Sequence, residues 1–302
     1  MIETSIVILS YRRPEGLRKA ILSCLAQEGI DAPFEIVVVD NDPERSAYSV
    51  ATELAAGSPV PLRYIAEPRR GISHARNAGV ANADGEYLAF LDDDEAADPH
   101  WLAALLATVR GFAADAVVGP VYPCVTPPSA ELDAYRRGVY TRDARVPTGT
   151  PLLRWRIGNS LFHKGRCFVG PEPFDLRLGL TGGEDSVFLR QITRRGCKMV
   201  WCAEAVVWED IPAERLAPGY LLRRSFRGAQ TTTFVCTVVR PRELRRAAWL
   251  MAGGCAQILI YGPAGLVLRL LNRPHWLPMM AKAVSGVGKL LFHPRLQPRL
   301  YR

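Results

Sequence analysis

Several features that would assign this sequence to a common class of protein are missing from it. Its seven cysteines are scattered and no two form a C-x-x-C pair, so a cysteine zinc site is not suggested. Because their number is odd, a disulfide framework is not predicted, and a reducing cytosol fits the pattern. The 302 residues contain no low-complexity tract and no repeat of solenoid period, which leaves an ordinary globular protein.

The beginning of the chain also lacks three familiar motifs. It has no basic segment followed by an apolar run, so no signal peptide is expected. After the first predicted strand, neither G-x-G-x-x-G nor G-x-x-x-x-G-K-[ST] occurs, which excludes a dinucleotide fingerprint and a P-loop. If the protein binds an anionic ligand, other groups must neutralise its charge.

Acidic residues are absent from the last part of the chain. Residues 244–302 contain nine Lys or Arg and no Asp or Glu, whereas the whole chain has a net charge of +8. The preceding residues are therefore nearly neutral, and the basicity belongs to this tail. Because its basic residues are interleaved with apolar ones, a membrane surface is the expected partner and nucleic acid is not.

Two segments of the tail have helical character. Residues 247–268 carry no charge and are long enough to cross a bilayer, but glycines and a proline interrupt them. Residues 276–292 carry Lys282 and Lys289, whose spacing of seven places them on one helix face, as in an interfacial helix. A spanning helix, a re-entrant helix, an interfacial pair and a hairpin packed against the body all fit this pattern.

The first part of the chain alternates strand-like and helix-like segments. Apolar runs of strand length occupy residues 5–9, 34–39, 62–65, 87–91 and 116–118. Helical spacing occurs at residues 14–27, 44–56, 72–83 and 99–112. This alternation, with strands that are apolar throughout, predicts an α/β fold with a mainly parallel sheet flanked by helices.

Polar clusters follow three of the predicted strands, at residues 10–13, 40–42 and 92–94. Parallel sheets bind ligands beyond the carboxyl ends of their strands, so these clusters are expected at one edge of the sheet. Side chains alternate along an extended segment, and Asp92 and Asp94 therefore face the same way. Carboxylates in this arrangement suit Mg²⁺ or Mn²⁺. The alternative is a solvated turn that caps the next helix.

Four segments of the chain stand in an order and spacing that are typical of a known family. They read SIVILSYRRPEGLRKAILSCLAQ, EIVVVDNDPE, GISHARNAGVANADGEYLAFLDDDE and GGEDSVFLRQITRRG. The chain thereby resembles inverting family 2 glycosyltransferases with the GT-A fold, most closely those that extend lipid-linked repeat units of bacterial exopolysaccharides such as succinoglycan. The resemblance implies a GT-A glycosyltransferase domain over residues 1–230 and a basic, hydrophobic, helical membrane-associating region over residues 231–302.

The resemblance assigns the acidic triplet to a divalent cation, Mn²⁺ or Mg²⁺. Asp94 would contact the ion directly, Asp92 would contact the ribose or the water shell of the ion, and Asp93 belongs to the same nucleotide-binding motif. Such an ion bridges the two phosphates of a nucleotide-sugar and stabilises the diphosphate leaving group.

The same resemblance implies a pocket for the nucleotide. Asp40 would accept a hydrogen bond from uracil, Tyr11 would pack against the base, and the backbone of Ser10 and Arg12 would line the pocket. Arg76 would reach towards the nucleotide, because a planar guanidinium pairs well with anionic oxygens. In the simpler alternatives, Asp40 caps a helix, Tyr11 packs within its loop and Arg76 is a surface residue.

Asp185, in the run Gly182-Gly183-Glu184-Asp185, is the candidate catalytic base. An inverting transfer needs one carboxylate to take the proton from the acceptor hydroxyl as it attacks the anomeric carbon. The resemblance gives this role to Asp185 and implies that Glu184 orients either the acceptor or Asp185. The alternative is that two acids in a first helical turn stabilise the helix dipole without any chemistry.

The segment after the predicted base helix departs from the family pattern. Where many members carry a histidine, this chain has Trp208. Further on, Arg223, Arg224 and Arg227 either supply positive charge to a diphosphate or a lipid headgroup or form a solvated basic helix face.

These features predict a metal-dependent inverting hexosyltransferase that moves a sugar from a UDP-sugar to a polyprenyl-diphosphate-linked glycan, in the synthesis of bacterial exopolysaccharide or surface polysaccharide. Its expected place is the cytoplasmic face of the inner membrane, attached peripherally or through the C-terminal region. One alternative, a sugar-phosphate nucleotidyltransferase, requires a glycine-rich phosphate loop that SYRRPEG lacks. The other is a non-catalytic protein that binds membranes or nucleic acid.

Overall fold

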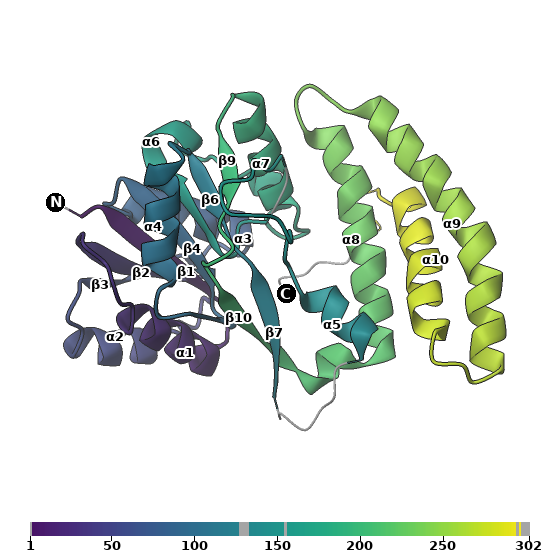
Figure 1. Cartoon of the computed structure of the whole chain (residues 1–302), viewed down its shortest axis with the longest axis horizontal. Helices are drawn as coiled ribbons and strands as arrows, with labels where there is room; N and C mark the ends of the chain where they lie inside the picture. The colour runs from purple at the N-terminus through teal and green to yellow at the C-terminus, as the bar shows by residue number, and fades with distance from the viewer. Residues whose placement is uncertain (1, 127–132, 154–155, 294–295, 297–302) are drawn as a thin grey trace.

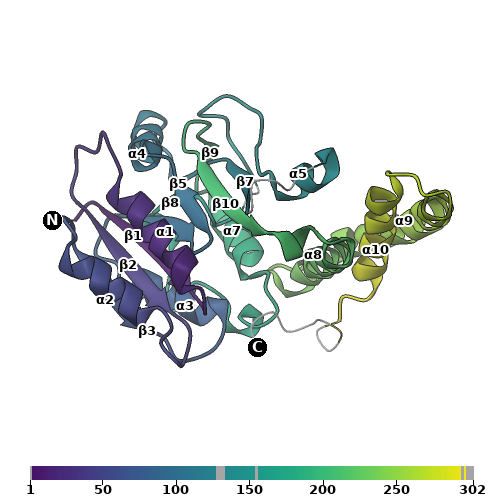
Figure 2. The same ribbon diagram turned by 90° about the horizontal axis from the view of Figure 1, so that it is seen from below.

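The computed structural model describes residues 2–126, 133–153, 156–293 and 296. A body of strands and flanking helices forms one side of the molecule, and the C-terminal helices stand beside it (Figure 1). The same division is visible when the molecule is seen from below (Figure 2). The carboxyl ends of the central strands and the helices next to them define the candidate site.

The main sheet has seven strands in the order β3-β2-β1-β4-β8-β6-β9. Their bounds are Thr4–Ser10 (β1), Phe34–Asp40 (β2), Leu62–Ala66 (β3), Tyr87–Asp92 (β4), Ala116–Val118 (β6), Ser160–His163 (β8) and Met199–Trp201 (β9). Only β8 runs antiparallel to its neighbours β4 and β6. The mainly parallel α/β sheet and all five predicted strands are thus confirmed.

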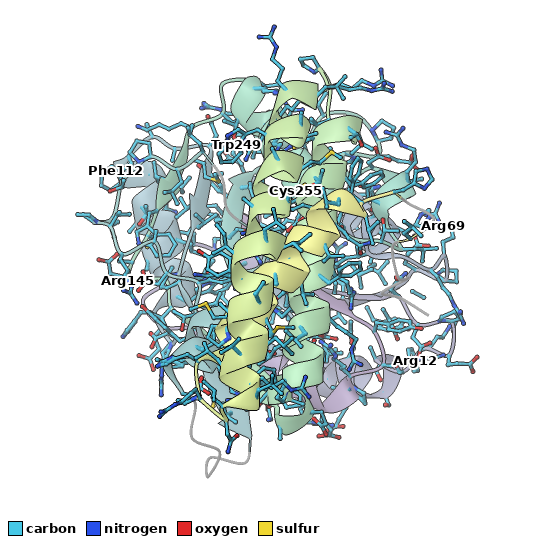
Figure 3. The ribbon with its side chains drawn as sticks, turned by 90° about the vertical axis from the view of Figure 1, so that its right-hand side faces the viewer. Arg12, Arg69, Phe112, Arg145, Trp249 and Cys255 are labelled. Carbon is cyan, nitrogen blue, oxygen red and sulfur yellow. The ribbon has the colours of Figure 1, made fainter. Side chains whose placement is uncertain are left out.

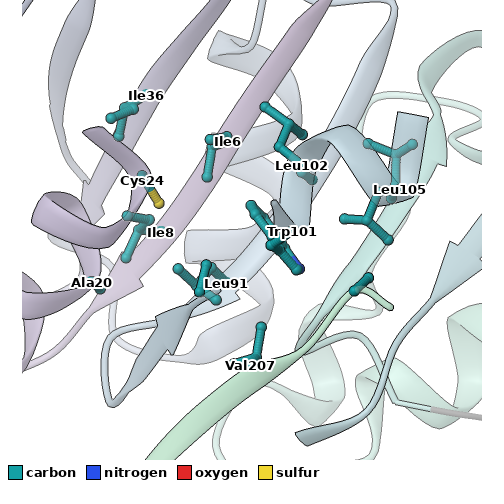
Figure 4. Close-up of a cluster of buried hydrophobic side chains, with 14 of the residues drawn as sticks. Ile6, Ile8, Ala20, Cys24, Ile36, Leu91, Trp101, Leu102, Leu105 and Val207 are labelled. Atoms are coloured by element: carbon teal, nitrogen blue, oxygen red, sulfur yellow. The ribbon is translucent and has the colours of Figure 1, made fainter. Parts of the chain in front are cut away.

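Helices cover both faces of this sheet. The main ones are Pro14–Leu25 (α1), Tyr48–Ala56 (α2), Ile72–Asn82 (α3), Trp101–Gly111 (α4) and Glu184–Arg194 (α7), with the short helix Lys164–Cys167 (α6). Another short helix, Ala134–Tyr140 (α5), lies away from this sheet, where Tyr140 packs against Ile211 and Leu221. Side chains of α1, α2 and α4 pack on one face of the sheet, in the cluster around Trp101 (Figure 4). Side chains of α3 and α7 fill the second cluster on the opposite face. Burying these apolar side chains provides the main stabilisation of the body.

Two helices begin later than their sequence pattern predicts. Helix α2 begins at Tyr48 because the Asp40 carboxylate accepts a hydrogen bond from the Ala47 N–H and the residues between them form a turn. Helix α4 begins at Trp101, since the Asp98 carbonyl accepts a hydrogen bond from the Trp101 N–H across a turn that contains Pro99. In both places an aspartate at the strand end or in the loop fixes a turn where the pattern predicts helix.

A second sheet extends the site beyond the acidic triplet. It consists of β5 (Glu95–Ala97), β10 (Val207–Pro212) and β7 (Val121–Thr126), in the order β5-β10-β7. Strand β5 follows the triplet directly and pairs antiparallel with β10, which places Glu95 opposite Glu209. The polar segment on β10 therefore lies beside the end of the central strand β4.

The C-terminal part forms three packed helices, α8 (Pro218–Val238), α9 (Leu244–Leu270) and α10 (Trp276–Leu290), with α10 between the other two (Figure 1). Glycines allow close backbone contact on both sides of α10. A Cβ on Gly286 would lie 2.5 Å from the Gly254 carbonyl oxygen of α9, and one on Gly288 would lie 2.3 Å from the Phe226 carbonyl oxygen of α8. Helix α8 includes residue 230, so the predicted boundary between the two regions falls within it and stays a prediction.

Asn159 links four parts of the body. Its side-chain amide donates hydrogen bonds to the carbonyls of Pro120 and Ala205, both at 2.7 Å, and its Oδ1 accepts one from the Trp101 indole N–H at 2.7 Å. Asn159 is fully buried, so water cannot take over the hydrogen bonds that its side chain makes with these groups.

Asn159→Ala is expected to destabilise the protein by about 2–4 kcal/mol, because it leaves the buried Ala205 carbonyl and the Trp101 indole N–H without a partner, while the Pro120 carbonyl keeps the Val207 N–H. Urea unfolding followed by circular dichroism measures this loss. Asn82→Ala is the control, since the Asn82 amide bonds only to the Ala78 carbonyl of its own helix. Equal losses in the two variants would contradict the linking role of Asn159.

Candidate active site

A cavity of about 480 Å³ opens at the carboxyl ends of the central strands, and we call it the first cavity. The strand register brings these ends together, with Ser10 opposite Asp40 and Leu9 opposite Asp92. Seven of the predicted site residues line it, namely Ser10, Tyr11, Arg12, Arg76, Asp92, Asp93 and Asp94. The prediction that the polar strand ends meet at one edge of the sheet is confirmed.

Two arginines neutralise the acidic triplet in part. The Arg13 Nη1 atom lies 3.0 Å from Asp93 Oδ1 and 2.8 Å from Asp94 Oδ2, and Arg215 Nη1 lies 3.1 Å from the same Asp94 oxygen. Asp93 also accepts a hydrogen bond from the Tyr11 N–H. Burial nevertheless raises the pKa of Asp93 to about 7, although the Arg13 charge opposes this shift.

A buried ionic layer lies beneath the triplet. Glu95 accepts a hydrogen bond from the Asp92 N–H, and the Arg142 guanidinium bridges Glu95 Oε1 at 2.8 Å and Glu209 Oε2 at 2.7 Å. Burial raises the pKa of Glu95, of Asp92 and of Glu209, and neighbouring carboxylates add to each shift. Burial is therefore the main reason why these carboxylates are costly to ionise.

Asp40 lies next to the first cavity but does not line it. Its carboxylate is buried and accepts hydrogen bonds from the Asp42 N–H at 3.0 Å, the Ala47 N–H at 2.8 Å and the Tyr64 hydroxyl at 3.1 Å. These contacts order the loop after β2, which corresponds to the capping alternative. The contact between Asp40 and a uracil ring stays a prediction.

Arg76 and Glu184 form a buried ion pair between α3 and α7. The Arg76 Nε atom lies 3.4 Å from Glu184 Oε1, and both side chains are almost fully buried. The guanidinium of Arg76 also lies over the rings of Phe90 and Phe174. Burial and the nearby Asp185 raise the pKa of Glu184 to about 7, against the effect of Arg76. Arg76 is thus an interior residue and not the surface arginine of the simpler alternative.

A second cavity of about 570 Å³ contains the candidate base. Asp185 reaches it from the first turn of α7, which follows the left-handed glycines Gly182 (φ 80°) and Gly183 (φ 99°). Its lining includes four arginines, Arg156, Arg223, Arg224 and Arg227. Tyr220 and Arg224 line both cavities, so the two spaces are adjacent. The structure places Asp185 beside the triplet cavity and not inside it.

Trp208, where the sequence was expected to depart from the family pattern, lies on β10 outside both cavities. Its side chain is 47% exposed and packs against Tyr122. It lines a separate hollow that also includes Asp94 and Arg215. The backbone beside it contacts the triplet, because the Asp210 N–H donates to the Asp94 carbonyl at 2.8 Å.

The residues at the first cavity are chemically suited to a divalent cation. In the part of the chain that the structure describes, no cluster of three or more His, Cys, Asp or Glu side chains is preassembled for a metal. Mg²⁺ and similar ions do not need one, since they bind through one or two carboxylates together with substrate phosphates. Asp92 and Asp94 line the cavity wall and provide such hard oxygen donors.

Several residues of this site were not predicted from the sequence. Arg13 stands in the polar cluster after β1. Its position just after a buried strand is the sequence feature that could have identified it as a site residue. Arg215 lies in the segment that departs from the family, and Arg142 lies in a long connection without a recognisable motif. Only the tertiary structure brings the last two to the acids of β4 and β5.

Comparison with known proteins identifies the class. The profile of the family Glycosyl transferase family 2 matches residues 5–163. The chain is 33% identical over 225 residues to the succinoglycan biosynthesis protein ExoM of Rhizobium meliloti, covering 74% of this chain and 72% of ExoM. It is 34% identical over 121 residues to the succinoglycan biosynthesis protein ExoW of the same organism, and the matched region covers 36% of ExoW. The chain belongs to glycosyl transferase family 2.

Solved structures confirm the fold. The chain matches Staphylococcus aureus TarS 1-349 in complex with UDP with a TM-score of 0.54 and 14% identity, over 95% of this chain and 89% of that one. TarS 1-349 in complex with UDP-GlcNAc gives a TM-score of 0.53 at 12% identity. The fold is of the GT-A type, and the protein is a glycosyltransferase related to enzymes of succinoglycan synthesis. The nucleotidyltransferase and non-catalytic alternatives are thereby set aside.

The raised pKa of Glu184 predicts how the stability of the protein changes with pH. The folded protein keeps this proton up to a pKa of about 7, whereas an ordinary Glu releases it near 4.5. The free energy of unfolding therefore decreases as pH rises from about 5 to about 8, and Glu184→Gln removes that contribution. Relative to wild type, the variant should gain up to about 3 kcal/mol between these pH values.

Urea unfolding at the two pH values measures this gain. Glu172→Gln, at an exposed position, is the control and should follow the wild-type pH dependence. If the curves of Glu184→Gln and wild type run parallel across the pH range, Glu184 does not hold a proton in the folded protein.

Proposed function

We propose that the protein is a metal-dependent inverting glycosyltransferase that moves a sugar from a UDP-sugar to a lipid-linked glycan in bacterial exopolysaccharide or surface polysaccharide synthesis. One observation carries this proposal: the first cavity, which contains the acidic triplet, lies next to the second cavity, which contains Asp185. The succinoglycan role of ExoM and the UDP and UDP-GlcNAc complexes of TarS support the choice of product and donor.

The first cavity is the proposed donor site. Asp94 and Asp92 would hold Mn²⁺ or Mg²⁺, which as a Lewis acid would stabilise the diphosphate leaving group. Arg13 and Arg215 lie on the same Asp94 oxygen and add positive charge at this end of the cavity. Tyr11 packs against the uracil ring, and the loop that Asp40 orders closes the base-binding side.

The second cavity is the proposed acceptor site, with Asp185 as the base. Its carboxylate takes the proton from the acceptor hydroxyl while that oxygen bonds to the anomeric carbon of the donor. The bond from the same carbon to the diphosphate oxygen breaks on the opposite side, so the configuration inverts. Glu184, held by Arg76, fixes the first turn of α7 and thereby the position of Asp185.

The arginines of the second cavity favour an anionic acceptor. Arg156, Arg223, Arg224 and Arg227 line this cavity, and planar guanidinium groups pair well with phosphate oxygens. A phosphate or diphosphate on the acceptor would bind to these groups. We propose that the acceptor is a polyprenyl-diphosphate-linked glycan and that the enzyme works at the cytoplasmic face of the inner membrane, with residues 231–302 as the membrane-associating region.

Asp185→Asn tests the assignment of the base. The variant should lose about 10²–10⁴-fold in transfer rate, because an amide cannot take the hydroxyl proton. UDP release from a panel of UDP-sugars, with Mn²⁺ and a bacterial lipid extract as the acceptor source, measures the rate. Glu172→Gln is the surface control, and full turnover of Asp185→Asn would remove Asp185 from its role.

Asp94→Asn tests the cation site separately from the chemistry. In wild type, adding Mn²⁺ with UDP should raise the stability beyond UDP alone, by about 2.7 kcal/mol when ligand is present at about 100 times its Kd. The variant should lose this Mn²⁺-dependent increment in a thermal-shift assay. Asp210→Asn removes a nearby acid that pairs with Lys19 and should keep the increment. An undiminished increment in Asp94→Asn would place the cation elsewhere.

A further inference from the structure

The outer side of α9 is an exposed apolar surface. Trp249 and Leu259 are both 75% exposed, Ile260 is 62% exposed, and Leu266 and Val267 are both 53% exposed. We call these five residues the outer face of α9. Residues 248–267 contain no charged side chain, and at 1.5 Å per residue they extend for about 30 Å. Figure 3 shows this helix from outside, with Trp249 and Cys255 on it.

A surface of this kind needs a covering partner. Soluble proteins seldom expose a continuous apolar strip, and such strips mark contacts with membranes or other proteins. Helix α9 is also long and apolar enough to cross a bilayer, and only 17% of its most apolar 18-residue stretch is buried within the protein. Two modes of lipid contact are therefore open, crossing the bilayer or lying in its surface.

The inner side of α9 argues against crossing. The Lys282 ammonium of α10 lies 4.6 Å from the centre of the Tyr261 ring, and the Lys289 ammonium donates to Gln257 Oε1 at 2.9 Å. Two cations thus lie against the middle of α9. If α9 crossed the bilayer, both would lie in hydrocarbon, where a charged side chain is strongly unfavourable.

The packing of α10 leads to the same conclusion. Gly286 brings α10 into backbone contact with α9, and Gly288 brings it into backbone contact with Phe226 of α8. Helix α8 in turn lines the second cavity with Arg223 and Arg227. A crossing α9 would therefore pull α10, α8 and the wall of the active site into the membrane.

The charges around the outer face indicate which lipids it contacts. Residues 244–302 contain nine Lys or Arg and no Asp or Glu. Arg245 stands before the apolar strip, and Arg269 and Arg273 stand after it, all three exposed. Anionic headgroups attract basic residues that lie near the membrane surface. The basic residues at both ends of the strip therefore favour a membrane with anionic headgroups, whether the helix spans it or lies flat, and the α10 lysines decide between the two.

We propose that the protein binds anionic membranes by laying the outer face of α9 flat in the lipid interface, without crossing the bilayer. This proposal rests on the membrane location given under the proposed function and specifies how the contact is made. It places α10, α8 and the catalytic body on one side of the membrane. Its test does not require activity, so it can fail while glycosyl transfer stands.

Vesicle flotation of the purified full-length chain tests the contact. The wild type should float with vesicles that contain phosphatidylglycerol, less with phosphatidylcholine alone, and less as salt is raised. Leu259→Glu combined with Leu266→Glu should weaken flotation by about tenfold or more, because two carboxylates enter the apolar interface. Leu22→Glu is the matched control, since Leu22 is an exposed apolar residue on α1, and it should float as wild type does.

A topology measurement separates lying flat from crossing. With a C-terminal epitope tag, protease should remove the tag from inside-out membrane vesicles and leave it intact in spheroplasts. Protection in the inside-out vesicles would show that α9 crosses the bilayer and would overturn the proposal.

Two further results would overturn it as well. One is flotation that the double Glu variant does not reduce. The other is a wild-type protein that does not bind anionic vesicles but is a dimer by light scattering, while the double Glu variant is a monomer. A second copy of the chain would then cover the outer face.

Discussion

The structure depends on how three adjacent carboxylates are accommodated at the end of a buried strand. Isolated buried carboxylates cost several kcal/mol each, and neighbours repel one another. Arg13 and Arg215 hold Asp94, Arg13 and a backbone N–H hold Asp93, and Arg142 binds two further acids in the layer below. Burial raises the pKa of Asp92 and of Asp93 although arginines lie nearby, so both carboxylates remain costly to ionise. The proposed cation would add positive charge beside them.

This arrangement also determines where the chemistry takes place. Because β4 ends at the triplet and β5 pairs with β10, the donor side is framed by strands of both sheets. The acceptor side is framed by α7 and α8, and the Arg76–Glu184 pair connects the first turn of α7 to the wall of the first cavity. Asp185 is thereby fixed relative to the triplet through packed secondary structure and not through a mobile loop. An enzyme that must align two substrates gains from such rigidity.

Much of the fold and part of the site could be predicted from the sequence. Continuous apolar runs identified the strands of the parallel sheet, and the positions of Ser10 and Asp92 after such runs placed them at one edge. The pattern was insufficient where tertiary contacts decide the outcome. Arg142 and Arg215 reach the acids from distant segments. Whether α9 spans the membrane or lies on it likewise depends on the lysines of α10. Their contacts with α9 cannot be read from the local sequence pattern.

The most direct test of the central claim is anomalous diffraction from crystals grown with UDP and Mn²⁺. The account predicts a manganese peak at about 2.1 Å from a carboxylate oxygen of Asp94 and from oxygens of the diphosphate. Clear density for UDP with no manganese peak at the triplet, or with the peak at other residues, would contradict it.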